Sequence, residues 1–251
     1  MFEGLANNYD RSRHDYPSAF RDHLVAVGAL TPSSRVVDLG AGTGQLALLA
    51  SSVASTVLAI DPEPDMVRVG QQITSGSAGV RWSLGADRDL AHLVSGRVDL
   101  VLIGNAFHFM DQPTLLHDLD RIMASDGVVV VCSSSIPVWL QQTDWSRALR
   151  SQLSAELNRA VSTSGAPDHD SDLAVLHASP FPIVDIWTHR FEHRRAVESV
   201  VGEVVSSTSG QIDRVAAARI SVALRPYSVD DTLPETVVTT ALVARRRAQK
   251  A

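Results

Sequence analysis

Residues 36–44 read Val-Val-Asp-Leu-Gly-Ala-Gly-Thr-Gly, an apolar run that ends in an acid and continues into three glycines at alternate positions. The run is typical of a buried strand, and the glycines predict a turn whose backbone comes close to a ligand. A second apolar run, 56–60, is closed by Asp61, whose carboxylate can accept hydrogen bonds from the hydroxyls of a ribose. Together the two strand ends predict a cofactor that contains a nucleoside.

The composition is that of an ordinary globular protein. Of the 251 residues, 45% are hydrophobic and 20% charged, which is enough to bury one substantial core and argues against disorder. The net charge is −6 and the basic residues are scattered, apart from a terminal cluster at 245–247 that is typical of a solvated tail. We therefore expect no nucleic-acid partner.

Cysteine usage and hydropathy bear on the compartment. The single cysteine, Cys132, follows the apolar run 128–131, so no intramolecular disulfide can form and the thiol is expected in the core. The amino terminus is polar, and no apolar stretch reaches the roughly 18 residues that a membrane helix needs. These features predict a cytoplasmic protein without membrane insertion, and none of them predicts an oligomeric state.

Strand-like and helix-like segments alternate along the first half of the chain. The expected strands are 35–39, 56–61, 80–84, 98–103 and 128–132, with helices between them. Short connections imply right-handed crossovers, and therefore a Rossmann-like, doubly wound and mostly parallel α/β sheet. Ligands bind such sheets at the carboxyl ends of the strands.

After residue 135 this alternation stops. A helix over 143–161, a breaker-rich stretch and a short helix over 173–177 predict a helical lid inserted after the fifth strand. We expect a single domain, 1–251, with four parts. They are an amino-terminal leader (1–30), a cofactor-binding core (35–133), the lid (136–180) and carboxyl-terminal strands and helices that complete the sheet (181–251).

The glycine turn differs from the dinucleotide fingerprint, which requires a further glycine where this chain has Gln45. The carboxylate of Asp38 would also repel a pyrophosphate at that place. An acid there suits a cationic or amino-bearing ligand better, so a nicotinamide oxidoreductase is the least favoured reading.

The chain resembles the class I S-adenosylmethionine-dependent methyltransferases. The resemblance rests on motifs in the family's order and spacing, at 36–44, 59–66, 85–87, 98–111 and 127–132. The leader, with Phe2, Ala6, Tyr9, Arg13 and Tyr16-Pro17, also looks like that of the small-molecule branch that includes trans-aconitate methyltransferase-like and type 11 enzymes. The resemblance implies S-adenosyl-L-methionine as cofactor, S-adenosyl-L-homocysteine as product, and a leader packed over the cofactor.

The resemblance also implies cofactor contacts at the strand ends. Asp38 would meet the ammonium, Asp61 the ribose hydroxyls, and the glycine turn the methionine portion. Pro62 and Met66 would flank the adenine, and the Ala86 amide and Asp87 would read its edge. The backbone carbonyls of Asn105 and Ala106 would lie near the methionine portion and the sulfonium. The predicted cofactor-binding residues are Asp38, Gly40, Ala41, Gly42, Gly44, Asp61, Pro62, Met66, Ala86, Asp87, Asn105 and Ala106. Helix capping is the alternative for Asp61 and Asp87, and a plain core position for Met66.

The acceptor side rests on fewer signals. His108 is the candidate general base, because it follows strand four and imidazole titrates near physiological pH; shaping the pocket is its alternative role. The predicted acceptor-lining residues are Tyr9, Arg13, His14, Tyr16, Phe107, Trp139 and Trp145, for which hydrophobic packing is the alternative. A loop group at 168–170 with His177 raises the possibility of a metal site, but it lacks helical ligand spacing, so we expect no metal.

The sequence therefore predicts a methyltransferase that transfers a methyl group to an oxygen, nitrogen or carbon nucleophile of a small molecule. The tryptophan-bearing lid favours an aromatic or heterocyclic acceptor. Two alternatives stay open. One is an enzyme of the same fold that uses S-adenosylmethionine only electrostatically, and the other is a non-catalytic subunit that stabilises a partner methyltransferase.

Overall fold

The computed structural model describes residues 16–134, 136–161, 168–208 and 210–246. These residues form two compact units. The larger unit contains the described residues of 15–134, 168–189 and 239–251, and the smaller unit contains those of 135–167 and 190–238. Each unit is described by itself below.

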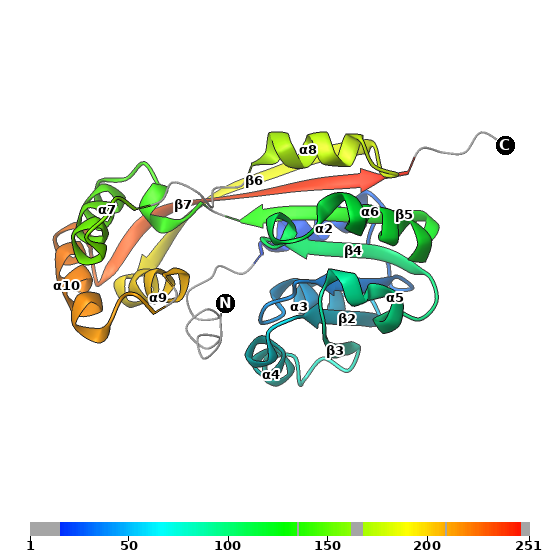
Figure 1. The fold of residues 1–251 in the computed structure, drawn as a ribbon, viewed down its shortest axis with the longest axis horizontal. Coiled ribbons are helices and arrows are strands. Elements are labelled where there is room, and N and C mark those ends of the chain that lie inside the picture. The colour runs from blue at the N-terminus through cyan, green and yellow to red at the C-terminus, as the bar shows by residue number, and fades with distance from the viewer. Residues whose placement is uncertain (1–15, 135, 162–167, 209, 247–251) are drawn as a thin grey trace. The chain divides into compact units, whose positions relative to one another are not determined.

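A seven-stranded sheet runs in the order β3-β2-β1-β4-β5-β7-β6 (Figure 1). Its strands are β1 (Arg35–Leu39), β2 (Thr56–Asp61), β3 (Val80–Leu84), β4 (Val98–Gly104), β5 (Met123–Ser134), β6 (Ile183–Ala196) and β7 (Thr232–Arg245). The first five strands pair in parallel, and β7 pairs antiparallel with β5. The prediction of a Rossmann-like, mostly parallel doubly wound sheet is confirmed.

The helices of the larger unit alternate with these strands. They are α2 (Ser18–Ala26), α3 (Gln45–Ser51), α4 (Pro64–Ile73), α5 (Leu90–Leu93), α6 (Gln112–Ile122) and α8 (His169–His177), with 3-10 turns η1 (Asp87–Asp89) and η2 (Phe107–Phe109). The smaller unit contains η3 (Val138–Leu140), α7 (Asp144–Leu157), α9 (Val197–Ser207), α10 (Arg214–Leu224) and η4 (Arg225–Tyr227).

Each face of the sheet is buried by its own set of helices. Successive strand residues point to opposite faces, so Val36 packs with α2 and α3 whereas Val37 packs with α6 and α8. On the second face, Leu116 of α6 and Leu176 of α8 are fully buried. Burial on both faces explains why β4 and β5 are apolar runs without polar alternation.

The smaller unit has a separate core. Trp145 and Leu149 of α7 pack with Val200 of α9 and Ile220 of α10. In the same unit, Arg195 is only 3% exposed and pairs with the buried carboxylates of Glu203 (2.7 Å) and Glu235 (3.7 Å). A core and a buried ion-pair network of its own make this part of the chain a folded unit.

The predicted lid boundaries differ from the observed division of the chain. Within 136–180, α7 belongs to the smaller unit, but α8 belongs to the larger one because Leu176 is buried under the sheet. The expected strand 128–132 is longer in the structure, because β5 begins at Met123 and its pairing with β4 continues across an irregularity between Val98 and Leu100. A covering role for 1–30 and for 136–180 stays a prediction.

Gly70 in α4 makes room for the partly buried indole of Trp82. A Cβ added at Gly70 would lie 2.2 Å from the ring of Trp82, and this ring is fixed by a 2.9 Å hydrogen bond from its Nε1 to Thr74 Oγ1. We therefore predict that Gly70→Ala lowers the free energy of unfolding. The overpacking cost of about 1–3 kcal/mol exceeds the roughly 1 kcal/mol that alanine gains in a helix.

Urea unfolding checks this prediction, with Gly76→Ala as the control because nothing lies within 4 Å of a Cβ added there. In a Trp82→Ala background, the Gly70→Ala change should become neutral or stabilising. A Gly70→Ala protein as stable as the wild type would contradict the packing argument.

Candidate active site

Four neighbouring strand ends form the candidate site in the larger unit. β3, β2, β1 and β4 are adjacent and parallel. Successive strands are added on one side of β1 up to β3, and then on its other side from β4 onward, so the strand order reverses between β1 and β4. Such a switch point is where open α/β sheets bind ligands. In register, Leu39 pairs with Ile60 and Asp61 with Leu84, so the carboxyl ends of the strands meet at one edge.

The glycine turn is set by packing as well as by conformation. Gly40, Gly42 and Gly44 have φ values of 68°, 57° and 91°, in the left-handed region that favours glycine. A Cβ added at Gly40 would lie 2.6 Å from the Cβ of Ala106, and one at Gly44 would lie 2.7 Å from the ring of Trp82. The sequence indicated the turn, but these two neighbours could not be read from it.

Asp61 joins this turn to the end of β2. Its Oδ2 accepts a 2.8 Å hydrogen bond from the amide of Gly42, and its Oδ1 accepts a 2.9 Å hydrogen bond from the amide of Glu63. Burial raises the pKa of Asp61, and these two amides act against the rise. The capping alternative is realised only in part, because Glu63 precedes α4. Each oxygen retains a lone pair for a ribose hydroxyl.

Asp38 is a buried carboxylate without a well-formed hydrogen bond on either oxygen. Asp38 is 1% exposed, and this burial raises its pKa to about 7. The backbone amide of Ala47 opposes the rise, and the negative charge of Asp61 adds to it. A buried acid without a partner is costly, so its presence at this edge suits a cationic group of a ligand. The site therefore fits the ammonium of an amino-acid moiety.

The residues predicted around the adenine differ in availability. Pro62 is exposed, whereas Met66 is 2% exposed and lies in the core, which is the alternative role considered for it. The amide of Ala86 donates to Asp89 Oδ2 at 2.9 Å, so Asp89 rather than Asp87 makes the capping contact of η1. Among the described residues none bonds the Asp87 carboxylate. Asp87 thus keeps its acceptor capacity, while a ligand contact to Ala86 requires Asp89 to release the amide.

Asn105 organises the end of β4. Its φ is 52°, and its backbone N–H donates to Cys132 O at 2.8 Å. Its side-chain Oδ1 accepts a 3.1 Å hydrogen bond from the backbone N–H of Ser134. Its Nδ2 also lies 3.4 Å from the hydroxyl of Tyr16. Tyr16 is therefore placed at the candidate site, beside Gly104, and the Asn105 side chain links β4 to β5, a role that sequence reasoning did not anticipate.

Two of the predicted acceptor residues are core residues in the structure. Phe107 is 2% exposed and packs under the sheet, and Trp145 is 2% exposed with its indole N–H donating to Pro234 O at 2.7 Å. Trp139 is partly buried against the same cluster as Trp145. The aromatic that the η2 turn exposes is instead Phe109, at 62%, next to His108, whose side chain is partly exposed and partly covered. Tyr9, Arg13 and His14 lie outside the described residues.

Polar residues of α8 lie near the η2 turn. His169 Nε2 is 3.3 Å from Ser133 Oγ at the end of β5, and Asp172 Oδ1 accepts a 3.3 Å hydrogen bond from Gln112 Nε2. The side chains at 168–170 and His177, which were considered as a metal site, do not converge. Asp168 caps α8 through the Ser171 amide, and His177 Nδ1 lies 2.9 Å from Pro182 O at the other end of the helix. Within the described ranges, no set of three or more His, Cys, Asp or Glu side chains could hold a metal ion.

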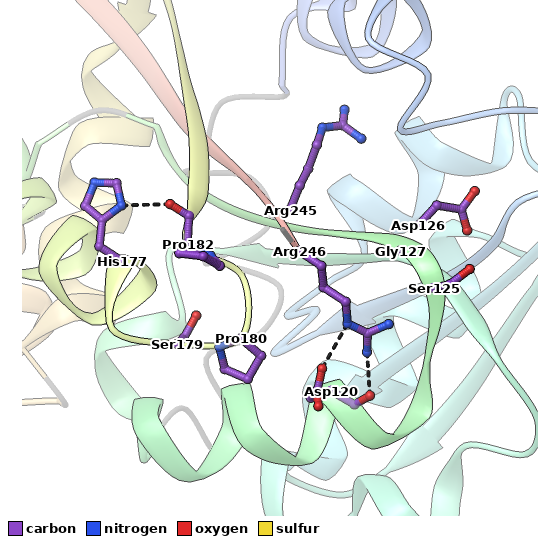
Figure 2. A pocket seen from close by; sticks show the side chains of 10 residues that line it. All are labelled: Asp120, Ser125, Asp126, Gly127, His177, Ser179, Pro180, Pro182, Arg245 and Arg246. Atoms are coloured by element: carbon purple, nitrogen blue, oxygen red, sulfur yellow. Dashed lines mark hydrogen bonds and ion pairs between the residues drawn. The ribbon is translucent and has the colours of Figure 1, made fainter. Parts of the chain in front are cut away.

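A separate pocket of about 1060 Å³ lies away from this edge, near the start of β5 (Figure 2). Figure 2 shows Arg246 directed at Asp120, whose Oδ1 it contacts at 2.9 Å, so its charge is already compensated. Arg245, in the same pocket, donates to Val27 O at 2.9 Å. This pocket contains none of the predicted cofactor residues, and we assign it no part in the reaction.

The fold is that of a Rossmann-like protein, and its strand-end site fits a nucleoside cofactor that carries a cationic group. Residues 37–131 match the family model described as "Methyltransferase domain". Over 215 residues the chain is 30% identical to an uncharacterised methyltransferase of Mycobacterium tuberculosis (strain ATCC 25618 / H37Rv), covering 83% of this chain and 78% of that protein. The chain belongs to the class I S-adenosylmethionine-dependent methyltransferases, and its cofactor is S-adenosyl-L-methionine.

More distant similarities agree. A ubiquinone/menaquinone biosynthesis C-methyltransferase of Rubrivivax gelatinosus is 27% identical over 145 residues, covering 55% of this chain and 56% of that protein. In fold, a proposed type II methyltransferase from Anaeromyxobacter dehalogenans matches with a TM-score of 0.65 at 20% identity, covering 94% of this chain and 97% of that one. Among the helices of the described residues, none combines the length and the hydropathy that a membrane span requires.

The raised pKa of Asp38 predicts a specific pH dependence of stability in the ligand-free protein. Between about pH 4 and pH 7 the unfolded chain loses the Asp38 proton while the folded protein keeps it, so the free energy of unfolding falls as the pH rises. We predict that Asp38→Asn removes this fall and stabilises the ligand-free protein by up to about 4 kcal/mol at about pH 8, with little effect at about pH 4.

Urea unfolding at a series of pH values measures this difference, and Asp126→Asn, at an exposed carboxylate, is the control for loss of one negative charge. If the plots of unfolding free energy against pH for the wild type and Asp38→Asn run parallel across this range, the pKa of Asp38 is not raised in the folded protein.

Proposed function

We propose that this methyltransferase acts on a small molecule, with an oxygen, nitrogen or carbon atom as the nucleophile. The observation that best supports a cofactor site at the strand ends is the buried Asp38 carboxylate, which lies beside the glycine turn and has no well-formed hydrogen bond on either oxygen. The net charge of −6 and scattered basic residues disfavour a nucleic-acid acceptor. The relative from Rubrivivax gelatinosus is named for quinone biosynthesis, which agrees with an aromatic or heterocyclic acceptor.

The residues at the strand ends would hold the cofactor by complementary charge and hydrogen bonding. Asp38 gains the cationic partner that it lacks in the ligand-free protein, and this partner favours its ionised form. Asp61 is already oriented by the amides of Gly42 and Glu63, so binding a ribose costs it no reorientation. The backbone of Gly40, Ala41 and Gly42 would lie against the methionine portion.

When bound, the cofactor supplies a methyl group activated by attachment to a sulfonium. The chain contributes alignment of the acceptor and exclusion of water. His108, on the η2 turn directly after β4, is the proposed proton acceptor. Partial burial lowers its pKa, so the imidazole is neutral and able to accept a proton near neutral pH.

Calorimetric titration with S-adenosylmethionine, S-adenosylhomocysteine and NAD tests the cofactor site. We expect binding of the first two and none of NAD. Gly42→Leu should weaken binding of S-adenosylhomocysteine by about 100-fold or more, because the side chain would occupy the space of the ligand at the turn.

Gly28→Leu is a matched control, since Gly28 also has a left-handed φ, 69°, but has open space where its Cβ would be. Gly28→Leu introduces similar backbone strain outside the proposed site, so this variant should bind S-adenosylhomocysteine as tightly as the wild type does. Affinity retained by Gly42→Leu, or lost equally in both variants, would refute the site.

A further inference from the structure

Two histidines and one carboxylate gather at the ends of β4 and β5. Gln112 connects the carboxylate to the backbone of the η2 turn, because its Nε2 lies 3.3 Å from Asp172 Oδ1 and 3.4 Å from Phe107 O. On α8, His169 lies three residues before Asp172, and residues three apart share one helix face. The helix face that carries Asp172 is therefore tied to the turn that carries His108.

This group lies next to the candidate site. The Asn105 side chain accepts from the amide of Ser134, which joins the ends of β4 and β5. Ser133, one residue earlier on β5, contacts His169, and His108 is three residues beyond Asn105. The histidines thus flank the strand ends at which the methyl donor is proposed to bind.

The electrostatics couple Asp172 to both imidazoles. Partial burial raises the pKa of Asp172, while His169, Gln112 and His108 act to lower it. For His108, the charge of Asp172 raises the pKa against the larger lowering by burial. The other acidic groups nearby are Asp168, which acts on Asp172 by repulsion, and Asp111, whose carboxylate accepts from the Thr114 hydroxyl at 2.9 Å.

We infer that Asp172 is a positioning residue for His108, and that the pair serves an acceptor bearing a hydroxyl group, such as a phenol or an enol. A neutral amine can attack without first losing a proton, whereas a hydroxyl benefits from a base. The inference deepens the proposed function and rests on it.

Methyl transfer to such an acceptor breaks two bonds and forms two. The O–H bond breaks and its proton passes to the imidazole of His108, while the oxygen forms a bond to the methyl carbon. The C–S bond breaks with its electron pair left on sulfur, which gives S-adenosylhomocysteine. The imidazolium, whose charge Asp172 compensates, then returns its proton to solvent.

A nuclear magnetic resonance titration tests the coupling without any acceptor. In full-length protein saturated with S-adenosylhomocysteine, the His108 signal is identified by its loss in His108→Gln. We expect Asp172→Asn to move the His108 titration to lower pH, because the variant removes a negative charge that favours the imidazolium. Asp170→Asn, which makes the same charge change at an exposed position of α8, should move it less. An unshifted titration in Asp172→Asn, or an equal shift in both variants, overturns the inference.

A colour change tests proton transfer from a hydroxyl. The probe is 4-nitrophenol, whose phenolate absorbs at longer wavelength than the phenol, with 4-nitroaniline as a matched compound without the acidic hydroxyl. In the saturated protein we expect a phenolate band stronger than that of the free probe at the same pH, reduced at least about tenfold by His108→Gln. No excess phenolate band, or one that His108→Gln leaves unchanged, overturns the inference.

Cofactor binding and proton transfer by His108 are tested separately. Lack of S-adenosylhomocysteine binding by calorimetry removes the proposed function and the inference with it. Normal binding together with an unresponsive His108 removes only the inference, and leaves a methyltransferase whose nucleophile needs no base.

Discussion

The bond between the Asp61 carboxylate and the Gly42 amide is the interaction on which the candidate site depends. It holds the turn after β1 against the end of β2, and the amides of Gly40 and Ala41 reinforce it by donating to Ile60 O at 2.9 and 3.0 Å. Because strand pairing fixes where β2 ends, the position of the turn is fixed before a ligand arrives. Preorganisation of this kind reduces the cost of ordering protein groups on binding.

The two acids of the site illustrate opposite solutions to burial. Asp61 has an amide on each oxygen, and these two hydrogen bonds offset part of the cost of burying its charge. Asp38 has a pKa of about 7 and only the Ala47 amide to oppose its desolvation, so the ligand-free protein holds it at a cost. Such local instability is common at functional sites, where the missing partner is the ligand. Cofactor binding and folding stability are therefore linked through one side chain.

Local patterns predicted most of the fold, and long-range packing accounts for what they missed. The runs that became β1, β2, β4 and the second half of β5 are apolar and bounded by breakers, so their length and composition predicted strands. Local pattern was less informative for β3, which mixes polar and apolar residues, and for the start of β5, which precedes its apolar run by five residues. The burial of Phe107 and exposure of Phe109 depend on how the η2 turn meets α6, which no local pattern encodes. The same holds for α8, since only its contact with the sheet, through Leu176, places it in the larger unit. Asp172 was missed because its partners His108 and Gln112 are about 60 residues away in the sequence.

The late pairing of β5 has a consequence for synthesis on the ribosome. Ser134 at the end of β5 meets Thr239 of β7, which follows 105 residues later, after the chain has built the smaller unit. At roughly 5–20 residues per second, the nascent chain presents the open edge of β5 for about 5–20 seconds. That edge contains four consecutive valines, 128–131, and an unpaired apolar edge is a template for pairing with another chain. The apolar run that makes β5 a good central strand is thus also a segment through which the nascent chain can aggregate until β7 pairs with it.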